Sequence, residues 1–92
     1  GECKKNLTGH TDFVRSLVIN NNNELISGSN DKTIKIWDMI TGECKRTLNN
    51  NSPILRLIID NNNQLISGSG DNAIKIWDMT TGECKRTLDE HT

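Results

Sequence analysis

The chain of 92 residues is poor in aromatic side chains, in proline and in long apolar segments. Its aromatic residues are Phe13, Trp37 and Trp77, tyrosine is absent, and Pro53 is the one proline. No apolar run reaches half of the roughly 20 residues that a membrane-spanning helix needs. No segment spaces its apolar residues three and four apart over three turns, which is the pattern of an amphipathic helix. The sequence therefore predicts neither a transmembrane helix nor a helical bundle.

An excess of charge is also absent. Eleven Lys and Arg residues are interleaved with twelve Asp and Glu residues, which gives a net charge of -1. A nucleic-acid-binding surface or a membrane anchor would need a basic stripe or cluster. We therefore expect neither nucleic acid nor membrane as a partner. We also see no secretory leader, and we expect a soluble protein in the cytoplasm.

The cysteines are few, and all three occur in the same local sequence, Gly-Glu-Cys. Cys3, Cys44 and Cys84 are thus one position of a repeat that occurs three times. A metal site commonly has Cys-x2-Cys pairs, and a disulfide framework usually has a denser, even set. We expect half-buried thiols on outer strands, reduced and separated from one another, with neither a metal nor another cofactor.

A long internal repeat dominates the sequence. Leu25 to Leu48 reads LISGSNDKTIKIWDMITGECKRTL, and Leu65 to Leu88 reads LISGSGDNAIKIWDMTTGECKRTL, with four differences in twenty-four positions. A period near forty, with a Trp-Asp pair closing one strand and a Thr-Gly turn opening the next, resembles the WD40 repeat of β-propellers. The resemblance covers essentially the whole chain and implies an interaction scaffold.

The segments between turn signals have the composition of β-strands. Side chains alternate between the two faces of a strand, so Ile34 and Ile36 should face one way and Lys35 and Trp37 the other. Both faces carry bulk, and both should be covered. Strands are predicted at residues 13–19, 24–29, 33–38, 43–48, 54–59, 64–69, 73–78 and 83–88, with a ninth at 1–7.

The turns are rich in Asn. Clusters occupy residues 20–23, 49–51 and 61–63. Asn-rich composition is also found in prion-like disorder. Here the clusters separate periodic strands, and Asn tolerates the left-handed backbone conformation, so turns are favoured over disorder. Gly42 suits a turn position with positive φ.

The resemblance implies an all-β segment of a WD40 β-propeller with two four-stranded antiparallel blades and one additional strand. We assign residues 1–7 to the outer strand of a preceding blade, 8–48 to blade one, 49–88 to blade two and 89–92 to the start of the next repeat. Two isolated blades share one interface and leave their outer faces, with Ile34-type or Trp37-type positions, exposed. We expect the chain not to fold stably alone and to need other WD40 blades, from identical chains or a longer parent.

The end strands support the same expectation. In a ring of identical chains, residues 1–7 and 83–88 would compete for one outer-edge position, so residues 1–7 should pair outside the two-blade unit. Gly1 is not an initiator Met, which suggests a processed, excised or engineered segment.

In the family, a hydrogen-bonded tetrad braces each blade, and the first repeat has all four residue types. A buried indole N–H and an imidazole need partners, which Ser and Asp can supply. In the second repeat the preceding loop lacks His, and Asn51 or Ser52 is the candidate substitute. The predicted network comprises His10, Ser27, Asp31 and Trp37 in the first repeat and Ser67, Asp71 and Trp77 in the second.

Ser, His and Asp together also raise the alternative of a catalytic triad. Ser27 lies inside a strand pattern, the Gly-x-Ser-x-Gly elbow is absent, and the second repeat has no His. We therefore favour a structural network and predict no catalytic residues. An anion site is a further alternative for the cations, but their alternation with acidic residues favours solvated strand edges; these are Lys35, Lys45, Arg46 and Lys75.

The leading functional hypothesis is a non-enzymatic scaffold that binds a protein or peptide of unknown identity. The alternative is a structural self-assembling repeat whose blade faces are its main interface, and an enzyme ranks third. Ordinary loop packing is an alternative for each contact position, and Arg56 rivals Leu55 because the second loop is one residue shorter. By family position, the partner-binding residues are Phe13, Arg15, Asn30, Pro53, Leu55 and Gly70.

Overall fold

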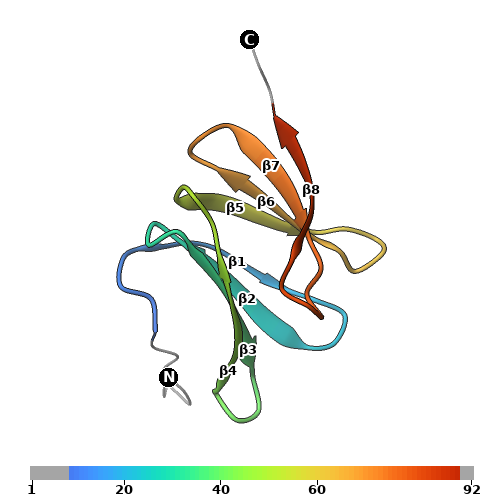
Figure 1. Ribbon diagram of the computed structural model, residues 1–92. Coiled ribbons are helices and arrows are strands. Elements are labelled where there is room, and N and C mark those ends of the chain that lie inside the picture. The colour runs from blue at the N-terminus through green and yellow to red at the C-terminus, as the bar shows by residue number, and fades with distance from the viewer. Residues whose placement is uncertain (1–8, 90–92) are drawn as a thin grey trace.

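The computed structural model describes residues 9–89, which form two four-stranded antiparallel sheets (Figure 1). Within each sheet the strands are neighbours in chain order. The first sheet contains β1 (Val14–Ile19), β2 (Glu24–Ser29), β3 (Thr33–Asp38) and β4 (Cys44–Asn49). The second contains β5 (Ile54–Ile59), β6 (Leu65–Ser69), β7 (Ala73–Trp77) and β8 (Cys84–Asp89).

The predicted all-β architecture is confirmed, and the eight predicted strands that fall in the described range are found with ends shifted by at most one residue. Among residues 9–89 there is no helix that is long and apolar enough to cross a membrane. The predicted ninth strand at residues 1–7 lies outside the described residues.

The turns follow from their side chains. Asn23 and Asn63 take the left-handed conformation at φ 61°, and Gly42 does so at φ 80°. The side-chain oxygen of Asn20 accepts two backbone N–H groups of its turn, each at 2.9 Å, and Asp60 does the same in the second sheet. These local bonds satisfy the backbone where the strands end, so the Asn clusters at 20–23 and 61–63 form turns.

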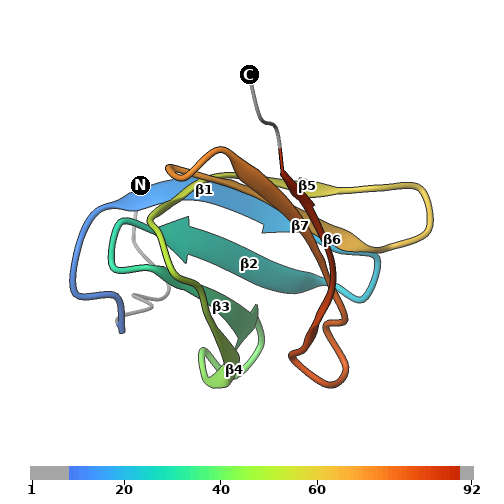
Figure 2. The same cartoon turned by 45° about the horizontal axis from the view of Figure 1, so that its top comes forward.

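The two sheets pack face to face, and the first strands of each, β1 and β5, lie side by side (Figure 2). The buried core lies between the sheets, where removal of aliphatic surface from water stabilises the pair. The first sheet contributes Ile26, Ile34, Ile36 and Leu48, and the second contributes Ile54, Leu57, Leu65 and Trp77.

The alternation predicted for β3 is found. Ile34 and Ile36 are buried against the second sheet, whereas Trp37 pairs with Leu25 on the opposite face. Trp37 is nevertheless buried, so the expectation that Trp37-type positions remain exposed is wrong. The chain before β1 covers the indole, since the His10 ring packs edge-on with its centroid 6.5 Å away and a Cβ added at Gly9 would lie 3.2 Å from Trp37 Cη2.

The thiols of Cys44 and Cys84 are free, but they are exposed and not half-buried as expected. Cys44 lies on β4 and Cys84 lies on β8, which are the outermost strands of their sheets, and neither residue is part of the packed core. Each Sγ contacts a backbone carbonyl of its own strand at 3.4 Å. Cys3 lies outside the described residues.

One glycine sets how closely the sheets approach. A Cβ added at Gly28 would lie only 2.4 Å from Cγ2 of Ile54, so the fully buried Ile54 fills the space where a side chain would stand. At the matching position of the second sheet, Gly68, the nearest atom to an added Cβ is Arg56 Cβ at 4.0 Å. The same residue in the repeat is thus tightly packed in one sheet and open in the other.

This difference predicts opposite tolerances for two identical changes. Gly28→Ala should lower the free energy of unfolding by about 1–3 kcal/mol, because the added methyl group overpacks the interface between the sheets. Gly68→Ala, the matched control, should change the free energy of unfolding of the single, unassociated chain by less than about 0.5 kcal/mol, as at other uncrowded surface positions. Urea denaturation followed by Trp fluorescence measures both, and equal losses would contradict the packing at Gly28.

Candidate functional site

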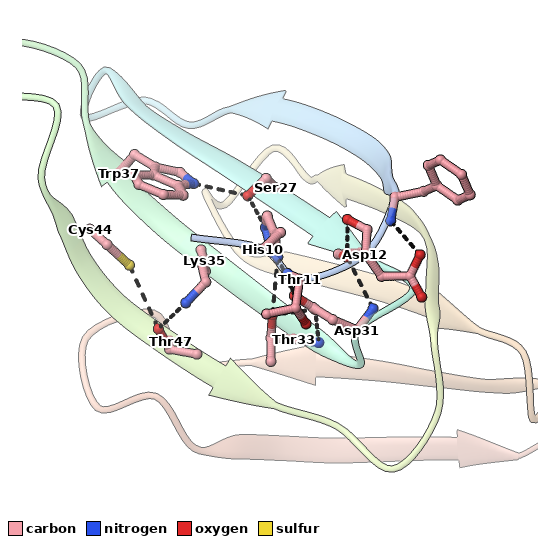
Figure 3. A network of polar contacts seen from close by, with 12 residues as sticks. His10, Thr11, Asp12, Ser27, Asp31, Thr33, Lys35, Trp37, Cys44 and Thr47 are labelled. Carbon is pink, nitrogen blue, oxygen red and sulfur yellow. Dashed lines mark hydrogen bonds and ion pairs between the residues drawn. The ribbon is translucent and has the colours of Figure 1, made fainter. Parts of the chain in front are cut away.

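The first sheet contains a continuous polar network (Figure 3). Trp37 Nε1 donates to Ser27 Oγ at 2.9 Å, and Ser27 Oγ lies 2.6 Å from His10 Nε2. His10 Nδ1 lies 2.9 Å from Asp31 Oδ2. All bonds are satisfied when Ser27 donates its hydroxyl hydrogen to Nε2 and His10 donates from Nδ1 to Asp31. The structure thus brings together the four residues that the sequence singled out in the first repeat.

Asp31 is held by more donors than the sequence indicated. Its carboxylate accepts from the Thr33 hydroxyl and from the backbone N–H groups of Thr11 and Thr33, in addition to His10. Burial alone would raise the pKa of Asp31, but these hydrogen bonds outweigh it and hold the pKa well below its usual range. Asp31 therefore remains ionised and links the loop before β1 to the turn after β2.

Thr33 is a network residue that sequence reasoning missed. Its hydroxyl donates to Asp31 and lies 3.2 Å from His10 Nδ1. A signal was present, because Ala73 replaces Thr33 in the repeat that has no His. The loss of both residues together is what a shared network requires.

The second sheet keeps only part of the network. Trp77 Nε1 donates to Ser67 Oγ at 2.9 Å. Asp71 does not join them: it accepts from the Ser69 hydroxyl and from the Ala73 N–H. The hydrogen bond from Ser69 is the main reason why the pKa of Asp71 is lowered. The predicted residues of this repeat therefore lie in two separate groups.

A lysine and an asparagine stand near Trp77 where the first sheet has His10. Lys75 Nζ donates to Asn50 Oδ1 at 2.6 Å and lies 5.9 Å from the centroid of the Trp77 ring. A cation at this distance from an indole face is attracted by the ring electrons. The Asn50 amide also donates to the Ser52 carbonyl at 2.8 Å, so Lys75 is linked to the loop before β5 through Asn50, and not through Asn51 or the Ser52 side chain.

Two further lysines of the strand edges also have local partners. Lys35 Nζ, the counterpart of Lys75, donates to Thr47 Oγ1 at 3.0 Å (Figure 3), and Lys45 pairs with Glu24. The hydrogen bond from Lys45 is the main reason why the pKa of Glu24 is lowered. These contacts agree with solvated strand edges and leave no cluster of unpaired cations among these three lysines.

The order Ser27, His10, Asp31 has the connectivity of a catalytic triad, but the site cannot admit a substrate. Ser27 is 2% exposed, and its oxygen lies between the indole and the imidazole. A nucleophilic Ser must reach a carbonyl group beside an oxyanion hole. The part of the chain that the structure describes also contains no group of three or more His, Cys, Asp or Glu residues arranged to hold a metal ion.

The residues proposed for partner binding lie at the end of the sheets opposite the Asn-rich turns at residues 20–23 and 61–63. Asn30 N–H donates to the Phe13 carbonyl at 2.9 Å, and Asn30 Oδ1 accepts from Arg15 Nε at 3.0 Å. In the second sheet, Gly70 N–H donates to the Pro53 carbonyl at 3.1 Å. The turn between β2 and β3 is thereby tied to the residue before β1, and the turn between β6 and β7 is tied to the residue before β5.

Strand register resolves the ambiguity between Leu55 and Arg56. In β1 a bulge leaves Arg15 unpaired between two pairs with β2, and in β5 the corresponding bulge leaves Leu55 unpaired. Arg56 pairs with Gly68, as Ser16 pairs with Gly28. Leu55 is therefore the structural counterpart of Arg15, and its side chain is exposed.

Together, these features define a class of protein. Two consecutive four-stranded antiparallel sheets stack face to face with their first strands side by side, and a Trp–Ser hydrogen bond braces each sheet. This is the arrangement of neighbouring blades in a repeat β-propeller. The family described as WD domain, G-beta repeat matches residues 1–38 and 42–78. The chain belongs to the WD40-repeat family.

Curated relatives match one half of the chain. The Ribosome biogenesis protein BOP1 homolog of Drosophila mojavensis is 51% identical over 47 residues, which is 50% of this chain and 6% of that protein. The proteins of the same name from Drosophila grimshawi and Drosophila melanogaster are 49% identical over the same length. The chain therefore matches only a small part of each relative.

The network predicts a coupled loss of stability. His10→Ala should lower the free energy of unfolding by about 1–3 kcal/mol, because the buried Ser27 hydroxyl loses its acceptor and Asp31 loses one of its donors. Chemical denaturation of the parent and the variant measures the loss. In a Thr33→Ala background the same change should cost less, since contacts in one network are not additive. A strictly additive pair, or an unchanged His10→Ala midpoint, would contradict a shared role.

Asp31 also predicts a dependence on pH. Its pKa is lower in the folded chain than the value of about 3.9 in an unfolded one, so its contribution is complete above that value and is lost as the pH falls towards the folded pKa. Asp31→Asn should be less stable than the parent at pH 6, and the difference should shrink below about pH 4. Thermal melts across pH 6 to 3 test this, and a constant difference would be the contrary result.

Proposed function

We propose that this chain is a non-enzymatic protein-binding scaffold, part of a larger or oligomeric WD40 propeller, whose partner docks where β1 and β5 begin. Family membership supports an interaction role. The docking residues that we propose are Phe13, Arg15, Asn30, Pro53, Leu55 and Gly70.

The observation that carries the proposal is the exposure of Phe13 beside an oriented Arg15. Phe13 is 73% exposed, although burial of an aromatic ring is strongly favourable. Asn30 binds both neighbours, through its N–H to the Phe13 carbonyl and through Oδ1 to the Arg15 guanidinium. Aromatic residues and Arg are the side chains most enriched in the energetic centres of protein interfaces.

The second sheet extends this surface with an apolar side chain. Leu55 is exposed at the position that Arg15 occupies in the first sheet, and β5 lies beside β1. The surface would suit a peptide that places an apolar side chain against Phe13 and Leu55 and a carboxylate against Arg15. A planar guanidinium can bind such a carboxylate through two parallel hydrogen bonds.

The relatives' names would place the partner in ribosome biogenesis. The matched segment is 6% of each relative and consists of repeat sequence, so the exposed loop surface and not the names carries the proposal. For the compartment we propose a reducing one, supported by the free, exposed thiols of Cys44 and Cys84. The cytoplasm suggested by the sequence and the nucleus suggested by the relatives both fit.

The proposal predicts which side chains a partner needs. Phe13→Ala and Arg15→Ala should each weaken partner binding about tenfold or more, equivalent to about 1.4 kcal/mol. Proteins retained by the immobilised chain are quantified by mass spectrometry, and the affinity of those retained is then measured by titration. The matched control is Ile40→Ala, because Ile40 is 86% exposed and apolar but lies in the turn between β3 and β4 at the other end.

Partners that are lost in both loop variants and kept in Ile40→Ala would support the proposed surface. Equal retention by all three variants would contradict it. Loss of the same partners in Ile40→Ala would contradict it as well, since binding would then not be specific to the Phe13 end.

A further inference from the structure

The surface that the first sheet contributes to the interface occurs again on the far face of the second sheet, where no other sheet among residues 9–89 covers it. Leu48 is 1% exposed in the interface, whereas its counterpart Leu88 is 47% exposed. The second sheet carries the same side chains in the same register as the first. The covered residues are Ile26, Gly28, Ile34, Ile36 and Leu48, and their identical counterparts are Ile66, Gly68, Ile74, Ile76 and Leu88.

The surface that the second sheet contributes to the interface likewise occurs again on the far face of the first sheet. Leu57 is 4% exposed within the interface, whereas its counterpart Leu17 is 60% exposed. Exposed aliphatic side chains of this size gather on one face of β1. The residues that the second sheet contributes are Ile54, Leu57, Ile59, Leu65, Trp77 and Met79, and their counterparts are Val14, Leu17, Ile19, Leu25, Trp37 and Met39. Of these counterparts, Trp37 is already buried by the chain before β1.

The two exposed faces have matching shapes as well as matching composition. A hollow of about 470 Å³ on the second sheet is lined by Arg56, Gly68, Ala73 and Ile74, among others. It is the counterpart of the place over Gly28 that Ile54 fills. Val14, the counterpart of Ile54, is exposed at the start of β1. The chain therefore presents both an unfilled hollow and a branched aliphatic side chain at the position that fills such a hollow.

A polar contact of the interface also has unused counterparts. Asn21 N–H donates to Asn63 Oδ1 across the two sheets at 2.8 Å. The matching groups are Asn61 N–H on the second sheet and Asn23 Oδ1 on the first. Asn23 and Asn63 share the same φ of 61°, so the acceptor side chain starts from the same backbone conformation in both turns.

We propose that the occupant of these faces is a second copy of this chain, packed head to tail, with Val14 of one copy in the hollow above Gly68 of the next. The contact repeats the interface between the two sheets of one chain. Because the two surfaces differ, it is heterologous, and it produces either a closed ring or an open array. This inference concerns the sheet faces and goes beyond the partner-binding loops.

One polar residue of the repeated interface is replaced on the far face of the second sheet. Ser16 Oγ accepts from Leu57 N–H at 3.0 Å across the sheets, and Arg56 stands at the position of Ser16 on the far face of the second sheet. An Arg in this place cannot accept that hydrogen bond. Arg56→Ser restores the acceptor, so it should tighten the association between copies.

Two variants block one face each, at the exposed Val14 and at Gly68, which has open space above it. Gly68→Leu fills the hollow, where an added Cβ meets nothing closer than 4.0 Å. Val14→Asp places a charge where the hollow requires an apolar group. Sedimentation velocity of the 92-residue chain from 1 to 200 μM should show species larger than the 10.3 kDa monomer for the parent. Each blocked variant alone should sediment as a monomer.

A mixture of the two blocked variants distinguishes the proposed geometry from other self-association. Gly68→Leu retains the Val14 face and Val14→Asp retains the Gly68 hollow, so an equal mixture should form a dimer and nothing larger. Ile40→Asp is the control, because its counterpart Thr80 stays exposed beside the existing interface, so the change should leave the parent's assembly unchanged. Circular dichroism of the same samples would show recovery of β-structure in the mixture even if each variant alone were unfolded.

A monomeric parent at 200 μM, folded or unfolded, would overturn the proposal. So would persistent oligomers in either blocked variant, a mixture that does not dimerise, or equal weakening by Ile40→Asp. A tenfold tighter association of Arg56→Ser would support the assigned register, whereas weaker association would contradict it.

Discussion

The fit of Ile54 over Gly28 is the contact on which the arrangement of the two sheets depends. A side chain at residue 28 would require the sheets to separate, since its Cβ would lie 2.4 Å from Ile54. The close approach lets Ile26 and Ile34 of the first sheet pack with Leu57 of the second in one buried core. Burial of these aliphatic groups is the main favourable term in joining the sheets, and the hydrogen bonds of Asn21 with Asn63 and of Leu57 with Ser16 add to it.

The polar networks have a different role, because they act within one sheet. Ser27 joins the middle of β2 to Trp37, and in the first sheet His10 and Asp31 extend this bond to the loop before β1 and the turn after β2. The second sheet keeps the Trp77 bond and replaces the extension with Lys75 and Asn50. The indole bond is therefore the common part, and the connection to the loop can be made with different chemistry.

Much of this fold was predictable from sequence, because the strands are short, alternating and separated by Asn, Asp and Gly turns. The local rules fail where a contact depends on the length of a loop. The shorter loop before β5 moves Asn50, not Asn51 or Ser52, to Lys75. The cover over Trp37 comes from Gly9 and His10, which strand periodicity does not place.

Near-identical repeats make the effect of context unusually direct. Leu17 and Leu57 have the same residue type and the same strand position, yet one is exposed and the other buried. The difference arises from the neighbouring sheet and not from the residue. Each blade of this kind thus has two faces that can pack against a neighbouring blade. Within the described part of the chain, only one face of each blade is packed in this way. The stability of such a repeat is the sum of each blade's own stability and the stability of its interfaces with neighbouring blades. The exposed faces that carry Leu17 and Leu88 therefore stabilise the fold only when a further blade packs against them.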